Sequence, residues 1–213
     1  MKITGLTHKI EYLAAGSKTI YWLASRYYRD VVKKEIGLAG ITEKDHVLCI
    51  GGGICPFSGI LFHQATGARV TIIDNSAGCV RKAKKIVHRL GLNEYVQVVC
   101  QDGGSQSLSL SEYTVIHFAM QVCPMDYVFS HVERLASFGT KLLVRLPKKC
   151  LEGMYSCLPE PIIENCIPTS HKNACNIGST VLYIKREQSQ ERFYEEIYQE
   201  KLNLRTLSKS CIL

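Results

Sequence analysis

Short apolar runs alternate with amphipathic segments along most of the chain. Five runs with strand character lie in the first half of 46–53 and at 68–74, 95–100, 113–119 and 141–146. Helical periodicity occupies the stretch from Pro56 to Gly67 and the segments 77–91 and 126–135. Strands separated by amphipathic helices are typical of an α/β fold with a doubly wound, mostly parallel sheet and helices on both faces. A further strand-like run at 179–187 follows a turn rich in Gly, Ser and Asn, which predicts a late antiparallel strand.

The sequence divides into three predicted parts. Residues 1–42 are expected to form a small N-terminal helical cap, because apolar side chains recur at helical spacing between Ile20 and Val31. Residues 43–187 carry the alternation of strands and helices and form a predicted Rossmann-like domain. Residues 188–213 are polar with a helical period, and we expect a C-terminal helical tail there.

Composition narrows the classes of function. Of 213 residues, 46% are hydrophobic and 21% are charged, which is close to globular averages. No apolar run reaches the roughly 18 residues of a membrane span, and the N-terminus lacks the apolar core of a secretory signal. The ten cysteines do not have the spacing of zinc sites. We therefore expect a cytoplasmic protein with reduced, mostly structural thiols and no metal.

The net charge of +7 raises the question of an anionic partner. The densest basic cluster lies within the helical segment 77–91 and comprises Arg81, Lys82, Lys84, Lys85, His88 and Arg89. No aromatic residues interleave with it, as a surface for single-stranded nucleic acid would require, so it is interpreted as a solvated helix face. We expect a small-molecule substrate, with no nucleic-acid or membrane partner and a homodimer as a candidate assembly.

Four loops of the predicted sheet are candidates for ligand binding. In doubly wound sheets the ligand lies beyond the carboxyl ends of the strands, where the strand order reverses. This rule selects the loops 51–58, 74–76, 101–104 and 119–124.

The first loop, GGGICPFSG, starts with three consecutive glycines between a strand and a helix. Glycines there allow a tight turn and a close approach of a ligand to the backbone. The dinucleotide pattern G-x-G-x-x-G is absent, because its last position is Pro56, and no Gly-Lys-Ser/Thr of a P-loop follows. A glycine-rich turn without a ligand is the alternative interpretation.

Acidic residues end the next two strands. Asp74 ends the second strand, where a carboxylate can accept hydrogen bonds from both ribose hydroxyls of an adenosine. Asp102 follows the third strand and could accept the exocyclic amine of adenine; for both residues, a turn or helix-cap role is the alternative. These three loops only partly distinguish a site for S-adenosylmethionine from a site for NAD. The absence of basic residues from the glycine loop and the late reversed strand favour S-adenosylmethionine.

The runs VLCIGGGICPFSGIL and GARVTIID resemble a class I S-adenosylmethionine-binding domain, and more narrowly the nicotianamine synthase family. The narrower resemblance rests on Gly51–Gly53 followed by Pro56, Phe57 and Ser58, on HFAMQV at 117–122, and on VRLPKKCLEGMY at 144–155. Methyltransferases of this class usually have an acid where this chain has Cys49. Nicotianamine synthases have a larger N-terminal helical region, and no acceptor-binding carboxylate can be matched here.

The resemblance implies a particular use of the sulfonium. Nicotianamine synthase-like enzymes direct an amine at the γ-carbon of the methionine portion and release methylthioadenosine, whereas methyltransferases release S-adenosylhomocysteine. The amine could belong to another molecule, which gives 3-amino-3-carboxypropyl transfer. It could instead be the α-amine of the same ligand, which gives cyclisation to azetidine-2-carboxylate. A small-molecule methyltransferase and a non-catalytic ligand sensor are the alternatives.

Three residues are candidates for catalysis. Gln121 follows the fourth strand, near the reactive end of the expected ligand. Arg145 could clamp the methionine carboxylate or act as a surface ion-pair partner. Tyr28, like its neighbour Tyr27, could place an aromatic face against the sulfonium or pack in the core. His117 is expected to be a buried strand residue. The predicted cofactor-binding residues are Gly51, Gly52, Gly53, Pro56, Ser58, Asp74, Asn75, Asp102, Gly103, Met120 and Gln121.

Overall fold

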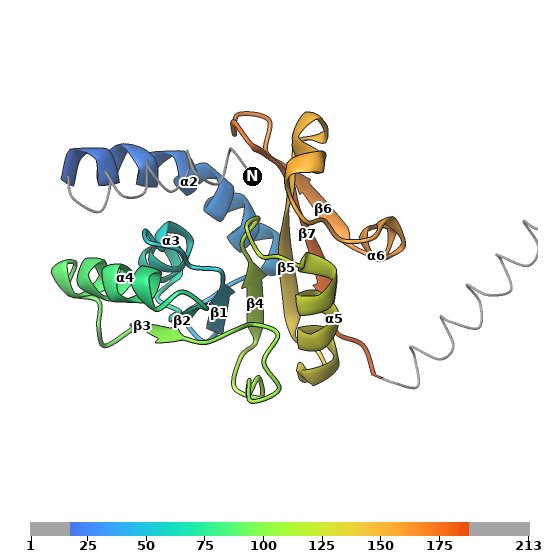
Figure 1. Ribbon diagram of the computed structural model, residues 1–213, viewed down its shortest axis with the longest axis horizontal. Coiled ribbons are helices and arrows are strands. Elements are labelled where there is room, and N and C mark those ends of the chain that lie inside the picture. The colour runs from blue at the N-terminus through green and yellow to red at the C-terminus, as the bar shows by residue number, and fades with distance from the viewer. Residues whose placement is uncertain (1–17, 188–213) are drawn as a thin grey trace, which may run out of the picture.

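The structure, a computed structural model, describes residues 18–187, which form one seven-stranded sheet with helices on both faces (Figure 1). The strands are β1 (His46–Ile50), β2 (Arg69–Asp74), β3 (Val96–Cys100), β4 (Val115–Phe118), β5 (Lys141–Pro147), β6 (Ile167–Ser170) and β7 (Ile177–Ile184). The helices are α2 (Lys18–Ala39), α3 (Phe57–Thr66), α4 (Ala77–Arg89), α5 (Met125–Leu135), the 3₁₀ helix η1 (Lys149–Met154) and α6 (Glu160–Glu164).

The strand order is β3-β2-β1-β4-β5-β7-β6. Strands β1 to β5 pair in parallel, whereas β7 runs antiparallel to both β5 and β6. The predicted fold class, with its late antiparallel strand, is therefore confirmed. Strand β6 was not predicted, because its four residues IPTS are mostly exposed and show no alternation of apolar side chains.

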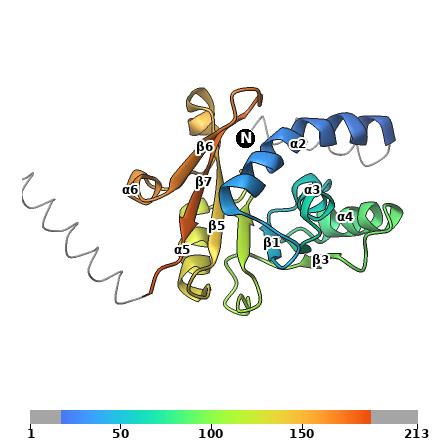
Figure 2. The same ribbon diagram turned by 180° about the vertical axis from the view of Figure 1, so that it is seen from behind.

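The sheet separates two apolar cores because successive strand side chains point to opposite faces. In β1, Val47 and Cys49 belong to the core under α3 and α4, whereas Leu48 and Ile50 belong to the core under α5. Figure 2 shows these helices on their two sides of the sheet from behind. Burial on both faces explains why the central strands are almost continuously apolar.

Helix α2 is the part of the predicted N-terminal cap that the structure describes. It packs against α3 and also contacts β5, β6 and β7. It therefore reaches from one half of the sheet to the other on the side of the glycine loop. Residues 1–17 of the predicted cap and the predicted tail 188–213 lie outside the described residues.

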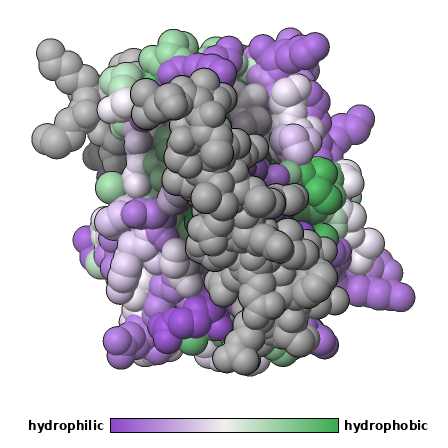
Figure 3. Space-filling model, turned by 90° about the vertical axis from the view of Figure 1, so that its right-hand side faces the viewer, coloured by the Kyte–Doolittle hydropathy of each residue, from purple (hydrophilic) through white to green (hydrophobic). Residues whose placement is uncertain are grey.

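The face drawn in Figure 3 is largely polar, and the described cysteines form no disulfide. Figure 3 shows hydrophilic side chains over much of the coloured surface, with smaller hydrophobic areas between them. Within residues 18–187, no helix combines the length and the hydropathy that crossing a bilayer requires. The cysteines of this range are not joined in disulfides, and burial raises the pKa of the Cys49 thiol to about 12. Cys100, at the end of the edge strand β3, is exposed.

Candidate active site

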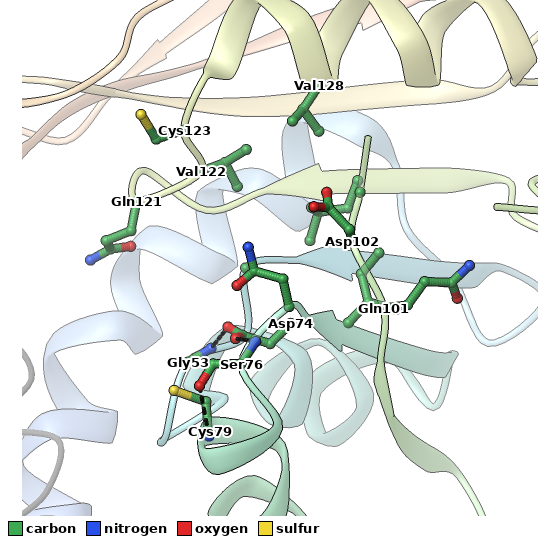
Figure 4. A pocket seen from close by; sticks show the side chains of 15 residues that line it. Gly53, Asp74, Ser76, Cys79, Gln101, Asp102, Gln121, Val122, Cys123 and Val128 are labelled. Atoms are coloured by element: carbon green, nitrogen blue, oxygen red, sulfur yellow. Dashed lines mark hydrogen bonds between the residues drawn. The ribbon is translucent and has the colours of Figure 1, made fainter. Parts of the chain in front are cut away.

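A cavity of about 360 Å³ lies beyond the carboxyl ends of β1, β2, β3 and β4 (Figure 4). The chain runs outward from β1 to β3 and then returns to β4 on the other side of β1, so the strand order reverses at the cavity. All four predicted loops contribute to its wall. The lining residues are Ile50, Gly51, Gly53, Ile73, Asp74, Asn75, Ser76, Cys79, Gln101, Asp102, Gly103, Gln121, Val122, Cys123 and Val128.

The glycine loop turns back against the end of β2. Gly51 and Gly53 have φ angles of 81° and 64°, which side-chain-bearing residues rarely adopt. The backbone N–H groups of Gly51 and Gly52 both donate to the carbonyl of Ile73, at 2.9 and 3.1 Å. A Cβ on Gly52 would overlap Cγ2 of Ile72. The three glycines therefore serve different purposes: two provide the turn, and the middle one allows close packing.

Replacing Gly52 with alanine is expected to destabilise the protein by roughly 1–3 kcal/mol, because the new methyl group must displace Ile72 in a packed core. Thermal unfolding measures the change. Gly37→Ala in α2 is the matched control, since nothing lies within 4 Å of the position that its new methyl group would take. That control, in the last turn of α2, should stabilise by at most about 0.5–1 kcal/mol, because alanine has a higher helix propensity than glycine. Equal effects of the two substitutions would contradict this account of Gly52.

Two backbone N–H groups, from different loops of the cavity, fix the carboxylate of Asp74. Its Oδ2 accepts a hydrogen bond from the backbone N–H of Gly53 at 2.8 Å, and its Oδ1 accepts one from the backbone N–H of Ser76 at 2.9 Å. A carboxylate has about four acceptor positions, so lone pairs remain for a ligand. The side chain is thus preorganised to accept hydrogen bonds from neighbouring hydroxyl groups.

Asp102 occupies the corresponding place after β3. Its Oδ1 accepts a hydrogen bond from the backbone N–H of Gly104 at 2.8 Å, which is the turn role anticipated for it. Its Oδ2 has no hydrogen bond within the described residues, so the turn role leaves an oxygen for a ligand. Figure 4 shows Asp74, Asp102 and Gln121 projecting from three different loops.

The cavity brings together many, but not all, of the predicted ligand-binding residues. Among the described residues, its lining includes Gly51, Gly53, Asp74, Asn75, Asp102, Gly103 and Gln121. Four others stand behind the lining: Gly52 against Ile72, Pro56 before α3, Ser58 beside Arg145, and Met120 in an apolar cluster. Gln101 and Cys123 also line the cavity; they lie in the predicted loops 101–104 and 119–124 but were not among the predicted binding residues. Cys79, in α4, lies outside the predicted loops, and only the packing of that helix brings it to the cavity.

Arg145 is buried and hydrogen-bonded to two protein side chains. It is 4% exposed, so it is not a surface ion-pair partner. Its Nε and Nη2 donate to Oε1 and Oε2 of Glu35, each at 2.7 Å, and its Nη1 donates to Oγ of Ser58 at 2.8 Å. The guanidinium is therefore directed at protein groups and does not line the cavity.

Glu35 was missed in the sequence, although a signal was present. It lies one helical turn from both Val32 and Ala39, on the apolar stripe of α2, where a charged residue requires a partner. Burial alone would raise the pKa of its carboxyl, but the guanidinium of Arg145 holds that pKa well below its ordinary value. Glu35 is thus a buried carboxylate anion.

Two histidines adjoin this ion pair. The hydroxyl of Thr180 donates to Oε1 of Glu35 at 2.7 Å, so the neighbouring Nε2 of His171, at 2.8 Å, must donate to Thr180. His117 lies in β4, with Nε2 3.8 Å from Oε1 of Glu35, and is buried as expected. Burial and the nearby Arg145 lower the pKa of His117, which favours the neutral ring.

Aromatic side chains of α2 and of the beginning of α3 contact one another. The ring of Tyr28 stacks on Phe57 at 5.5 Å, meets Tyr27 edge-on at 5.0 Å, and lies 5.5 Å from Cζ of Arg145. Tyr28 and Tyr155 also pack against the cluster that contains Met120, the neighbour of the cavity residue Gln121. The hydroxyl of Tyr155 is buried without a hydrogen-bond partner among the described residues.

Known proteins with the same fold include a nicotianamine synthase. A variant of that protein, MtNAS, solved in complex with S-adenosylmethionine, aligns with a TM-score of 0.73 and 20% identity, over 86% of this chain and 75% of that chain. MtNAS in complex with MTA and tNA aligns with a TM-score of 0.70 and 20% identity, over 86% of this chain and 71% of that chain. An RNA methyltransferase from Salinibacter ruber, in complex with S-adenosyl-L-homocysteine, aligns at 0.56 with 18% identity, over 75% and 92% of the two chains. These matches show the class I S-adenosylmethionine-dependent methyltransferase fold.

Sequence comparison with curated proteins finds similarity over only part of the chain. An L-histidine 2-aminobutanoyltransferase from Yersinia pestis is 31% identical over 84 residues, which is 39% of this chain. The match spans 31% of that protein, or about a third of its length. No protein-family profile matches the chain.

Proposed function

We propose that the cavity binds S-adenosylmethionine as the substrate of a group-transfer or cyclisation reaction. The carboxylate of Asp74 accepts hydrogen bonds from the two ribose hydroxyls. Oδ2 of Asp102 accepts a hydrogen bond from the exocyclic amine of adenine. The observation that carries this proposal is the fixation of Asp74 by the backbone N–H groups of Gly53 and Ser76, which leaves its other lone pairs for a diol. No Lys or Arg occurs among the described lining residues, which suits a ligand without a pyrophosphate.

The bond that breaks is the one between the sulfonium and the γ-carbon of the methionine portion. Two similarities support this choice over methyl transfer. MtNAS has been solved both with S-adenosylmethionine and with MTA, and the curated relative is named an aminobutanoyltransferase. The RNA methyltransferase of the same fold aligns less well, and methyl transfer is the second candidate reaction.

The reaction needs a neutral amine aligned with the γ-carbon. The amine nitrogen forms the new C–N bond, the C–S electron pair stays on sulfur as the thioether of methylthioadenosine, and the ammonium product releases a proton to water. Holding the reacting atoms about 3–3.5 Å apart and in line supplies much of the acceleration. The methionine portion extends beyond the cavity toward Tyr28, which does not itself line the cavity, and the aromatic ring favours a nearby cation. Gln121 extends from the loop after β4 beside the reactive end.

Incubation of the purified protein with S-adenosylmethionine alone, followed by mass spectrometry, tests the reaction. Intramolecular attack gives methylthioadenosine and azetidine-2-carboxylate in equal amounts. Intermolecular attack gives methylthioadenosine and the aminocarboxypropyl adduct only after an amine is added. Heat-denatured protein is the control, since S-adenosylmethionine also decomposes slowly to methylthioadenosine by itself. S-adenosylhomocysteine as the product would replace the proposal with methyl transfer, and binding without turnover would indicate a sensor.

A further inference from the structure

The ion pair between Glu35 and Arg145 joins parts of the chain that lie far apart in sequence. Glu35 belongs to α2, Arg145 to β5, and Thr180, which donates to Glu35 at 2.7 Å, to β7. The third arm of the guanidinium reaches Ser58, at the beginning of α3, at 2.8 Å. The carboxylate of Glu35 and the guanidinium of Arg145 thus connect α2, the glycine-loop segment (residues 51–58) and the two neighbouring strands β5 and β7.

Both side chains are buried, at 0% exposure for Glu35 and 4% for Arg145. Buried ion pairs are weak evidence for stability, because the loss of hydration offsets much of their attraction, and apolar side chains of similar volume often serve as well. Unlike an apolar pair, this ion pair fixes the orientation of both side chains. Two parallel hydrogen bonds of 2.7 Å fix the plane of the guanidinium relative to α2.

That fixed guanidinium touches two groups on which the proposed chemistry depends. Its Cζ lies 5.5 Å from the ring centroid of Tyr28, which is seven residues before Glu35 on the same helix. The Tyr28 ring in turn stacks on Phe57, the neighbour of Ser58. The ring is therefore held between the guanidinium and the segment that follows the glycine loop.

We infer that Glu35 is a positioning residue, which acts through Arg145 to hold the Tyr28 ring and the glycine-loop segment in the relative arrangement that the sulfonium reaction needs. The inference rests on the proposed function. It assigns Arg145 a supporting task in place of direct contact with the methionine carboxylate. Neither side chain lines the cavity among the described residues.

The test compares Glu35→Gln, Arg145→Lys and Ser58→Ala with the wild type. Glu35→Gln keeps the shape and removes the charge, Arg145→Lys keeps the charge and removes the fork, and Ser58→Ala removes only the arm to the glycine-loop segment. Glu133→Gln is the matched control: it breaks the 2.6 Å ion pair between Lys185 and Glu133, which involves neither Tyr28 nor the glycine loop. Circular dichroism at the assay temperature verifies that each variant is folded.

Three quantities are measured: kcat, the Kd of methylthioadenosine, and the ratio of the Kd values of S-adenosylhomocysteine and S-adenosylmethionine. In Glu35→Gln and Arg145→Lys we expect kcat to fall about 10- to 100-fold, as for a misplacement of about 1 Å. The preference for the sulfonium over the thioether should fall about 2- to 5-fold, because the Tyr28 ring is no longer held near the cation. The Kd of methylthioadenosine should stay within about 2-fold, since the hydrogen bonds that hold Asp74 and Asp102 involve none of the three substituted residues. Ser58→Ala should show the same pattern more weakly.

The outcomes separate this inference from the proposed function. Folded Glu35→Gln and Ser58→Ala proteins with unchanged kcat and an unchanged affinity ratio would overturn the inference. So would a parallel weakening of all three ligands, which indicates a purely structural role. If the wild type binds S-adenosylmethionine without releasing methylthioadenosine, the proposed reaction is wrong, and the affinity ratio still decides the inference. If the wild type does not bind S-adenosylmethionine, the proposed function and the inference about Glu35 are both wrong.

Discussion

Replacing Asp74 with alanine is expected to weaken binding of S-adenosylmethionine about 100-fold or more. The substitution removes the acceptor for two ribose hydroxyls, and a hydrogen bond to a charged group contributes roughly 1.5–3 kcal/mol. It also removes the acceptor for the N–H groups of Gly53 and Ser76, which shape the loop. Isothermal titration calorimetry with S-adenosylmethionine and S-adenosylhomocysteine measures the loss.

A ligand substitution separates the two effects of the Asp74 variant. The wild type should bind 2′-deoxy-methylthioadenosine more weakly than methylthioadenosine, whereas the alanine variant should bind both with nearly the same low affinity. Asp74→Asn keeps an acceptor oxygen without the charge and should fall between the two proteins. If Asp74→Ala bound S-adenosylmethionine as tightly as the wild type does, the ribose site would have to be elsewhere.

Replacing Arg145 with methionine is expected to destabilise the protein by about 3–5 kcal/mol, because the buried carboxylate of Glu35 then lacks its counter-charge. At about 2–4 °C per kcal/mol for a chain of this size, the midpoint of thermal unfolding should fall by roughly 6–20 °C. The double variant Glu35→Leu with Arg145→Met should regain most of this loss, since an apolar pair needs no counter-charge. A single variant within about 1 kcal/mol of the wild type would show that the carboxylate is easily accommodated alone.

The same pair gives the stability a dependence on pH. The pKa of Glu35 is lower in the folded protein than its ordinary value of 4.5. Its contribution to the free energy of unfolding is therefore complete above about pH 4.5 and is lost as the pH falls below that value. Urea unfolding from pH 7 to pH 3 should show this loss in the wild type and a smaller loss in the Glu35→Leu, Arg145→Met protein. Equal pH dependence in both proteins would contradict the assignment of the buried charge to Glu35.

Much of the fold could be read from local pattern. The strands β1 to β5 and the helices α3, α4 and α5 were predicted within a few residues, because each has a buried apolar run or stripe. The elements β6, η1 and α6 were not, since none of their segments buries a periodic apolar face. Their formation depends on neighbours, such as β7 for the edge strand β6, that local sequence does not reveal.

The amino-acid sequence by itself determined which loops face the cavity, because parallel strands put all their carboxyl ends at one edge. It also identified Asp74 and Asp102, since a polar residue at or just beyond the carboxyl end of a strand must lie at that edge. Only the tertiary structure decided the surroundings of Arg145. Its partners Glu35 and Ser58 come from two helices, and Glu35 lies 110 positions away in the chain. Contacts at such separation depend on how helices and strands pack together, which no local pattern of residues specifies.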